Sequence, residues 1–284
     1  IMRVTKTINN NVVCCVDDAG REAIAMGRGL GFTLRAGAYL DEAHAEKIFR
    51  MDTSEEQRRL SDLFSRLDPQ QIELCSKIVD HAAEDLGRRL CPSIYLTLTD
   101  HLCFALERLR DGEVFQNPLL AEVRTFYPRE YAVGKYALAL LQQTLGVSFP
   151  DDEAASIAMH IVNAEYENSI SNTLRITQAL HDIVRTLKGW PGLGFSDETN
   201  FYDEFTVHLK FLVFRAFSGK CQTQEDAPFV RAVRRCYPME FHCVEQITEG
   251  LSKRSGAQLP DAELAHLAAA LHRTCVRPSK QKKG

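Results

Sequence analysis

Two histidines occupy the same position in two similar stretches of this sequence, and they are the residues best suited to chemistry. His101 lies in LTDHLCF and His208 in FTVHLKF, and an arginine follows each of them seven residues later, as Arg108 and Arg215. A neutral imidazole can accept a phosphoryl group when one ring nitrogen is exposed and oriented. Seven residues make about two helical turns. We therefore expect each arginine to share a helix face with its histidine and to screen a phosphate carried there.

A second group of residues, near the N-terminus, suits nucleic-acid binding better than catalysis. Lys6 and Arg28 can neutralise phosphates, Asn11 can read base edges, and Phe32 can stack on an unpaired base. No pair of residues suited to acid–base catalysis occurs in this stretch. The residues alone leave a second interpretation open, in which the asparagines and glycines form ordinary hairpin turns beside a solvated basic face.

The elements that would position this N-terminal group are short strands. Alternating and β-branched residues predict strands over residues 3–8, 12–16 and 22–26, with turns at 9–11 and 18–20. A loop over residues 27–32 should then lead into a fourth short strand. Such a sheet has too small a core to be secure alone, so we expect one of its faces to form a homodimer and the other to carry the binding residues.

The elements that would position the histidines are helices, and they come in two copies. Tyr127-Pro128 matches Tyr237-Pro238, and the segment 146–151 (GVSFPD) matches 256–261 (GAQLPD). The offset is 107 residues at the two histidines and 110 at these later pairs, which implies a three-residue insertion. An internal repeat of this length is one domain used twice.

Helical periodicity over residues 71–87, 132–145 and 151–165 predicts that each copy is an all-α helical bundle. His160 lies on the last helix of the first copy. We expect a multidomain protein: an antiparallel β-sheet domain over residues 1–58, and helical domains over 59–170 and 171–284. A polar stretch at 51–57 would be the first hinge, and a joint would lie near 168–172.

Composition excludes several classes of protein. The chain of 284 residues is 45% apolar and 25% charged, and it contains no apolar run of about 18 residues, so no membrane span is expected. Its nine cysteines form no CxxC pair, and no HExxH motif occurs. We expect reduced thiols, no metal, no cofactor and a cytoplasmic location. The basic segment 277–284 is expected to be a disordered, solubilising tail.

Two runs near the N-terminus resemble a known family. Lys6-x-Ile8-Asn9-Asn10-Asn11-Val12 and the run MGRGLGF over residues 26–32 are similar to the RNA-binding domain of the BglG/LicT family of bacterial transcriptional antiterminators. The resemblance implies a homodimeric sheet domain that binds an imperfect RNA hairpin. By position, it implies the following RNA contacts: Lys6, Asn11, Gly27, Arg28 and Phe32.

The helical copies resemble the two phosphotransferase-system regulation domains of the same family, each of which carries two phosphorylatable histidines. Carried over by position, the phosphorylation sites are His101 and His160 in the first domain and His208 in the second. The fourth position is Ala270. His272 lies two residues further on, on a different helix face, so we do not substitute it. The resemblance implies inhibition by the sugar-specific transporter through the first domain, and activation by the phosphocarrier protein through the second.

These observations lead to the expectation of a non-enzymatic transcription antiterminator. It would stabilise an RNA hairpin that overlaps a terminator in a sugar-utilisation operon, under the control of histidine phosphorylation. Two alternatives remain at this point. A histidine phosphocarrier would not need an RNA-type N-terminal domain. A DNA-binding activator with the same regulation domains would need a helix-turn-helix, whereas residues 2–40 have β-strand character.

Overall fold

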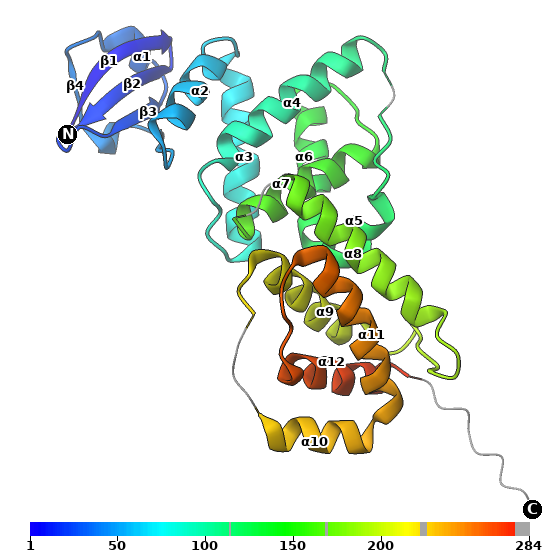
Figure 1. Cartoon of the computed structure of the whole chain (residues 1–284). Coiled ribbons are helices and arrows are strands. Elements are labelled where there is room, and N and C mark those ends of the chain that lie inside the picture. The colour runs from blue at the N-terminus through cyan, green and yellow to red at the C-terminus, as the bar shows by residue number, and fades with distance from the viewer. Residues whose placement is uncertain (114, 168–169, 222–225, 276–284) are drawn as a thin grey trace, which may run out of the picture. The chain divides into compact units, whose positions relative to one another are not determined.

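The computed structural model describes residues 1–113, 115–167, 170–221 and 226–275 (Figure 1). The chain divides into two compact units, Ile1–Ile170 and Ser171–Gly284, and we describe each unit by itself. The expected tail at 277–284 lies outside the described residues, as do residues 168 and 169 of the expected joint.

The first unit begins with a five-stranded antiparallel sheet in the order β4-β1-β2-β3-β5. The three strands expected from the sequence are confirmed. The bounds of the five strands are β1 Met2–Asn9, β2 Val12–Asp17, β3 Glu22–Met26, β4 Tyr39–Leu40 and β5 Lys47–Phe49.

The expected loop at 27–32 is wrong in one respect, because its second half is the short helix α1 (Leu30–Thr33), and the fourth strand follows only at Tyr39–Leu40. Gly29 begins the helical turn in the left-handed region, at φ 73°. At Gly31 a Cβ atom would lie 1.9 Å from the carbonyl oxygen of Asn9, so only glycine can pack there against the β1–β2 hairpin. A short 3₁₀ turn, η1 (Glu42–His44), lies between β4 and β5.

Both faces of the sheet are covered within the unit. One face forms a small core that includes Val4, Val13, Ala25 and Leu30. The other face packs on helix α2 (Ser54–Phe64) and on the helices that follow it, in a cluster of these buried residues: Val12, Ile24, Met26, Phe49, Leu60, Phe64, Ile72 and Leu96. The small sheet is therefore supported by its own chain, so the expectation that it needs a second copy for a secure core is wrong, and its dimerisation stays a prediction.

The expected hinge at 51–57 is wrong, because helix α2 begins inside it. The Thr53 hydroxyl accepts a hydrogen bond from the Glu56 amide at 3.2 Å and donates one to the Glu56 carboxylate at 3.1 Å. A polar Thr-x-x-Glu sequence of this kind caps a helix start, and its composition alone resembles that of a linker. The expected domain boundary after residue 58 falls within α2.

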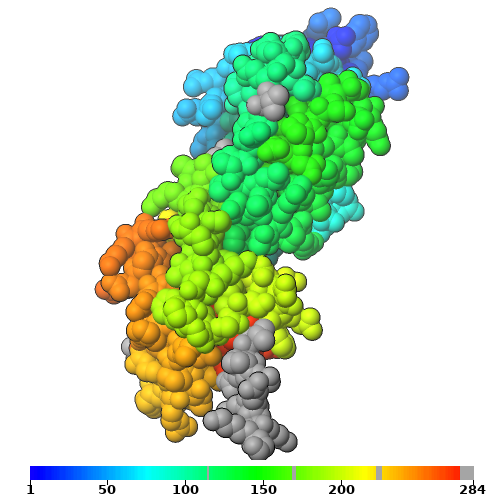
Figure 2. Space-filling view, turned by 90° about the vertical axis from the view of Figure 1, so that its right-hand side faces the viewer, coloured from blue at the N-terminus to red at the C-terminus, as the bar shows by residue number. Residues whose placement is uncertain are grey.

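The rest of the first unit is a bundle of five helices: α3 Pro69–Leu86, α4 Ile94–Arg110, α5 Leu120–Phe126, α6 Pro128–Leu145 and α7 Asp151–Glu165. The three helices expected from periodicity are confirmed. Helices α6 and α7 lie in direct backbone contact, since a Cβ atom on Gly134 would lie 2.2 Å from the carbonyl oxygen of Ala154. Apolar side chains of α3, α4, α6 and α7 fill the common core, and the space-filling view shows the outer surface that these helices build (Figure 2).

The second unit repeats this order with α8 Ile170–Lys188, α9 Tyr202–Ser218, α10 Ala227–Cys236, α11 Pro238–Ser255 and α12 Asp261–Thr274. The repeated sequences mark the same structural points. Pro128 and Pro238 begin α6 and α11, and Gly146 and Gly256 end these helices at φ 69° and 75°. The duplication predicted from sequence is therefore a duplication of structure.

All nine cysteines are free thiols. Within the described part of the chain, no helix is both long and apolar enough to cross a membrane. Among the same residues no cluster of histidine, cysteine and carboxylate side chains is arranged to hold a metal ion.

Candidate phosphorylation site and nucleic-acid interface

The two groups expected to act together in the first bundle, His101 and Arg108, meet at a carboxylate. Helix α4 runs unbroken through both residues, so they share one face. Nε2 of His101 lies 3.0 Å from Oε2 of Glu153 on α7, and Nη2 of Arg108 donates to Oε1 of the same carboxylate at 2.5 Å. The Glu153 side chain is only 4% exposed. This carboxylate therefore holds the histidine and the arginine at once.

Arg108 is also fixed by two aromatic rings. Its guanidinium carbon lies 4.8 Å from the centroid of Phe104 and 4.5 Å from that of Phe115. Rings at these distances stabilise a cation by their negative faces. The arginine is thus preorganised beside His101, with Glu153 as its present anionic partner.

His160 lies two turns after Glu153 on α7 and faces the same site. Its ring centroid is 4.8 Å from that of His101, and the residue is 8% exposed. Burial, with a smaller contribution from His101, lowers the pKa of His160 to about 3, so this imidazole is neutral at physiological pH. Its Nδ1 is buried without a hydrogen-bond partner. The structure thus places all three predicted side chains of the first site together, with His101 and Arg108 partly exposed and His160 buried.

The second bundle repeats the ion pair but not the histidine pair. Nη2 of Arg215 donates to Oε2 of Glu263 at 2.6 Å, and Glu263 occupies the position of Glu153 in the repeat. His208 is exposed on α9. Ala270 presents a methyl group where the first copy has His160. The second site is therefore more open and lacks a buried imidazole.

His272 contacts a different part of the second bundle. Its Nδ1 lies 2.7 Å from Oε1 of Glu240 on α11, and its ring stacks on Tyr237 with centroids 3.9 Å apart. The neighbours of His272 are thus distinct from the Arg215–Glu263 pair.

The two glutamates were missed by the sequence analysis, although a signal for them exists. Each is the third residue after the matched prolines, in Pro-Asp-Asp-Glu for Glu153 and Pro-Asp-Ala-Glu for Glu263. Comparison of the two copies at these positions would have found them. Their pairing with the arginines requires α4 to meet α7 in the first copy and α9 to meet α12 in the second, and these contacts are not visible in the sequence.

In the sheet domain, four of the five expected RNA-binding residues gather at the end of the β1–β2 hairpin. The side-chain oxygen of Asn11 accepts from the Gly29 amide at 2.9 Å, and the Gly27 amide donates to the Asn11 carbonyl at 2.9 Å. These contacts hold the turn from which Arg28 and Phe32 project. Phe32 is 74% exposed, and Arg28 is exposed as well.

Asn11 and Gly27 therefore stabilise the turn that carries the exposed residues, and they contribute little exposed surface themselves. Gly27 is buried, and a Cβ atom there would lie 2.9 Å from a methyl carbon of Leu30. Lys6, the fifth residue, is exposed further along β1, opposite Cys14 of β2. The side chains open to a ligand are thus two cations and one aromatic ring.

Comparisons with known proteins match both parts of the chain. The CAT RNA binding domain model matches residues 2–58, and the PRD domain model matches residues 76–164 and 183–274. Transcription antiterminator LicT of Bacillus subtilis is 35% identical over 272 residues, which cover 96% of this chain and 98% of that protein. The beta-glucoside operon antiterminator of Dickeya chrysanthemi is 36% identical, with 96% of each chain covered.

A solved structure agrees with the fold of the first unit. The crystal structure of the CAT-PRDI segment of GlcT superposes with a TM-score of 0.52 at 28% identity, and it covers 58% of this chain and 98% of that one. The sheet followed by a helical bundle is thus shared with that protein. By its sequence, its repeat and its fold, this chain belongs to the BglG/LicT family of transcription antiterminators, in which a CAT RNA binding domain precedes two PRD domains.

Proposed function

We propose that the sheet domain of this chain, as a homodimer, binds a folded RNA hairpin and so prevents a downstream terminator from forming. The observation that carries this proposal is Phe32, a phenylalanine 74% exposed on a turn held in place by Asn11. Exposure of such a ring to water is unfavourable, and stacking on an unpaired base would bury it. Arg28 and Lys6, both exposed, supply positive charge for the RNA backbone.

The His101 site would act as the switch in the first regulation domain. A phosphohistidine carries close to two negative charges, and a phosphoryl group on the ring nitrogen that faces Glu153 would occupy the space of the present 3.0 Å contact with that carboxylate. The two anions repel each other, while Arg108 is already in place to pair with the phosphate. Glu153 would then lose both partners, and the contact between α4 and α7 would change.

His208 would receive a phosphoryl group in the second domain without such a rearrangement, because it is exposed. In this proposal a small phosphocarrier protein of the sugar phosphotransferase system would be the phosphoryl donor at His208, and the sugar-specific transporter would act on the first domain. With Ala270 in place of a fourth histidine, His208 alone would control the second domain. Both domains would regulate the RNA-binding domain by a change in how two protomers associate.

RNA binding is tested with the full-length chain and a hairpin RNA in a filter-binding titration. We expect Phe32→Ala and Arg28→Ala each to weaken binding about 5- to 150-fold, because a stacking or ionic contact is worth about 1–3 kcal/mol. Tyr39→Ala is the matched control, because Tyr39 is another exposed aromatic residue of the sheet, at 70% exposure. Unchanged affinity in both test variants, or equal binding of duplex DNA, would contradict the proposal.

The switch is tested by phosphorylation with purified phosphotransferase proteins and labelled phosphoenolpyruvate. We expect Glu153→Ala to alter labelling of His101 and to leave labelling of His208 unchanged, because Nε2 of His101 faces this carboxylate. Label that is chased from the chain onto a third protein would instead identify a phosphocarrier.

A further inference from the structure

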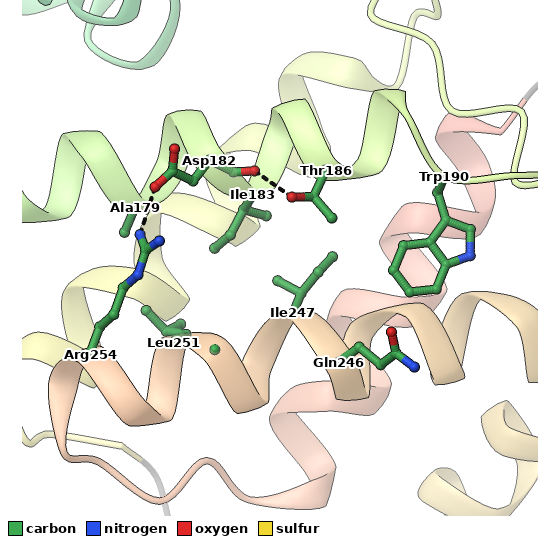
Figure 3. Close-up of a pocket in the computed structure, with 10 residues that line it drawn as sticks. Ala179, Asp182, Ile183, Thr186, Trp190, Gln246, Ile247, Leu251 and Arg254 are labelled. Atoms are coloured by element: carbon green, nitrogen blue, oxygen red, sulfur yellow. Dashed lines mark hydrogen bonds and ion pairs between the residues drawn. The ribbon is translucent and has the colours of Figure 1, made fainter.

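The second unit contains a pocket between α8 and α11, away from the Arg215–Glu263 pair (Figure 3). Its volume is about 230 Å³. Pockets for drug-sized ligands are usually about 300–1,000 Å³, so this one has room for a single ring. Its floor is aliphatic and is formed by Ala179, Ile183, Ile247 and Leu251, all of them buried.

A glycine in the middle of α11 opens the pocket. Gly250 corresponds to Leu140 in the first copy, where the leucine is half-buried and packs on the core. Nothing lies within 4 Å of the position that a Cβ atom on Gly250 would take. Neither close packing nor an unusual φ angle therefore explains this glycine, and glycine is a poor helix former. The second copy thus lacks, at this position, the side chain that packs on the core in the first copy.

The walls of the pocket differ at its two ends, as Figure 3 shows. At one end stands Trp190, the only tryptophan of the chain, with the Gln246 amide close to it. At the other end Nη1 of Arg254 donates to Oδ2 of Asp182 at 2.8 Å. An aromatic face, an amide and an ion pair around an apolar floor suit a ring that has one C–H face and hydroxyl groups at its edge.

The charges at the pocket select against an anion. Asp182 pairs with Arg254 at 2.8 Å and, on its other oxygen, with Arg185 at 3.6 Å, and Arg185 is not among the residues that line the pocket. The Asp182 carboxylate would repel a phosphate brought to the Arg254 guanidinium. The same pair can accept and donate hydrogen bonds to neutral hydroxyl groups. A neutral sugar ring therefore matches the site better than a sugar phosphate does.

We propose that this pocket binds the ring of a neutral pyranoside, with Trp190 against its apolar face and with Gln246, Asp182 and Arg254 on its hydroxyl groups. The second regulation domain would thus respond to a glycoside directly, in addition to any phosphorylation. The proposal goes beyond RNA binding and phosphohistidine control, and its test involves neither.

The full-length chain is titrated with methyl β-glucoside while the fluorescence of Trp190 is recorded, with calorimetry in parallel. Because no other tryptophan is present, the signal reports on this pocket alone. We expect a saturable change with methyl β-glucoside and none with glucose 6-phosphate. Gly250→Leu, which restores the side chain of the first copy, should weaken binding at least about tenfold by filling the space.

Two further variants distinguish specific binding in the pocket from a general effect of substitution. Glu249→Leu adds the same side chain at an exposed neighbouring position outside the pocket and should leave affinity unchanged. Gln246→Met removes one polar group from an exposed position and should weaken binding without affecting folding.

Three results would overturn the proposal. The first is the absence of a saturable response to the glucoside. The second is equal binding of glucose 6-phosphate, or of benzene with no effect of Gln246→Met, which would indicate a plain apolar cavity. The third is a Trp190 signal that depends on protein concentration instead of the glucoside, which would indicate self-association through this face.

Discussion

Each bundle contains an arginine–glutamate ion pair at the same position of the repeat, and the two ion pairs are buried to different extents. Comparing them tests how burial changes the contribution of an ion pair to the free energy of unfolding. In the first copy the Arg108 side chain is 16% exposed and that of Glu153 is 4% exposed. In the second copy the corresponding values for Arg215 and Glu263 are 30% and 12%. The same chemistry is thus more deeply buried in the first unit.

Glu153→Ala would leave the Arg108 guanidinium buried without its carboxylate. Removal of one partner of a buried pair costs about 3–5 kcal/mol. Arg108 keeps its contacts with two phenylalanine rings, so we expect the lower end, about 3 kcal/mol. A domain of about 150–250 residues loses roughly 2–4 °C of Tm for each kcal/mol, which predicts a fall of about 6–12 °C for the first unit. Glu263→Ala should cost about 1 kcal/mol, because its pair is more hydrated.

Differential scanning calorimetry measures both transitions, and Trp190 fluorescence identifies the one that belongs to the second unit. We expect Glu153→Ala to lower only the Tm of the first unit, whose unfolding Trp190 does not report. Glu263→Ala should lower only the Tm of the second unit, whose unfolding Trp190 does report. If Glu153→Ala shifts its transition by less than about 2 °C, a buried charge is not being left unpaired. The assignment of Glu153 as the anchor of the His101 site would then be wrong.

Three more predictions follow from particular contacts. The folded-state pKa of His160 is about 3, below its unfolded value, so its contribution to stability is complete above about pH 6.5 and is lost as the pH falls towards 3, by about 1.4 kcal/mol per pH unit. Urea unfolding from pH 7 to pH 5 should show this loss of stability, and His160→Gln should abolish the pH dependence. Gly134→Ala should destabilise the first bundle by about 1–3 kcal/mol, because the added methyl group would meet the Ala154 carbonyl. Gly250→Ala should stabilise the second bundle by about 0.5–1 kcal/mol, because the position has room for a methyl group and alanine is the better helix former. Thermal denaturation followed by circular dichroism compares the two variants. Asn11→Ala should weaken RNA binding without touching a base, by freeing the Gly29 amide, and NMR of the Gly29 amide should report the loosened turn even without RNA.

Local sequence determined the elements and their repetition. Strand alternation around Val12 and Ile24, and the proline and glycine punctuation of α6 and α11, are local signals, because they depend on backbone preferences over a few residues. The duplicated bundle and the candidate acceptors His101 and His208 could therefore be predicted. The prediction of a hinge at 51–57 was wrong, because the helix cap at Thr53 has the same polar composition as a linker.

Tertiary structure alone decided how these residues are used. Glu153 is 45 residues from Arg108 and 52 from His101, and only the packing of α4 on α7 makes one carboxylate serve both. The same packing buries His160 and lowers its pKa, while the matching position in the second copy holds a methyl group. Burial and long-range pairing depend on which helix faces meet, a property of the whole chain that no short stretch of sequence contains. The sequence by itself therefore determined which groups are available, and the fold decided which are exposed, which are paired and which are neutral.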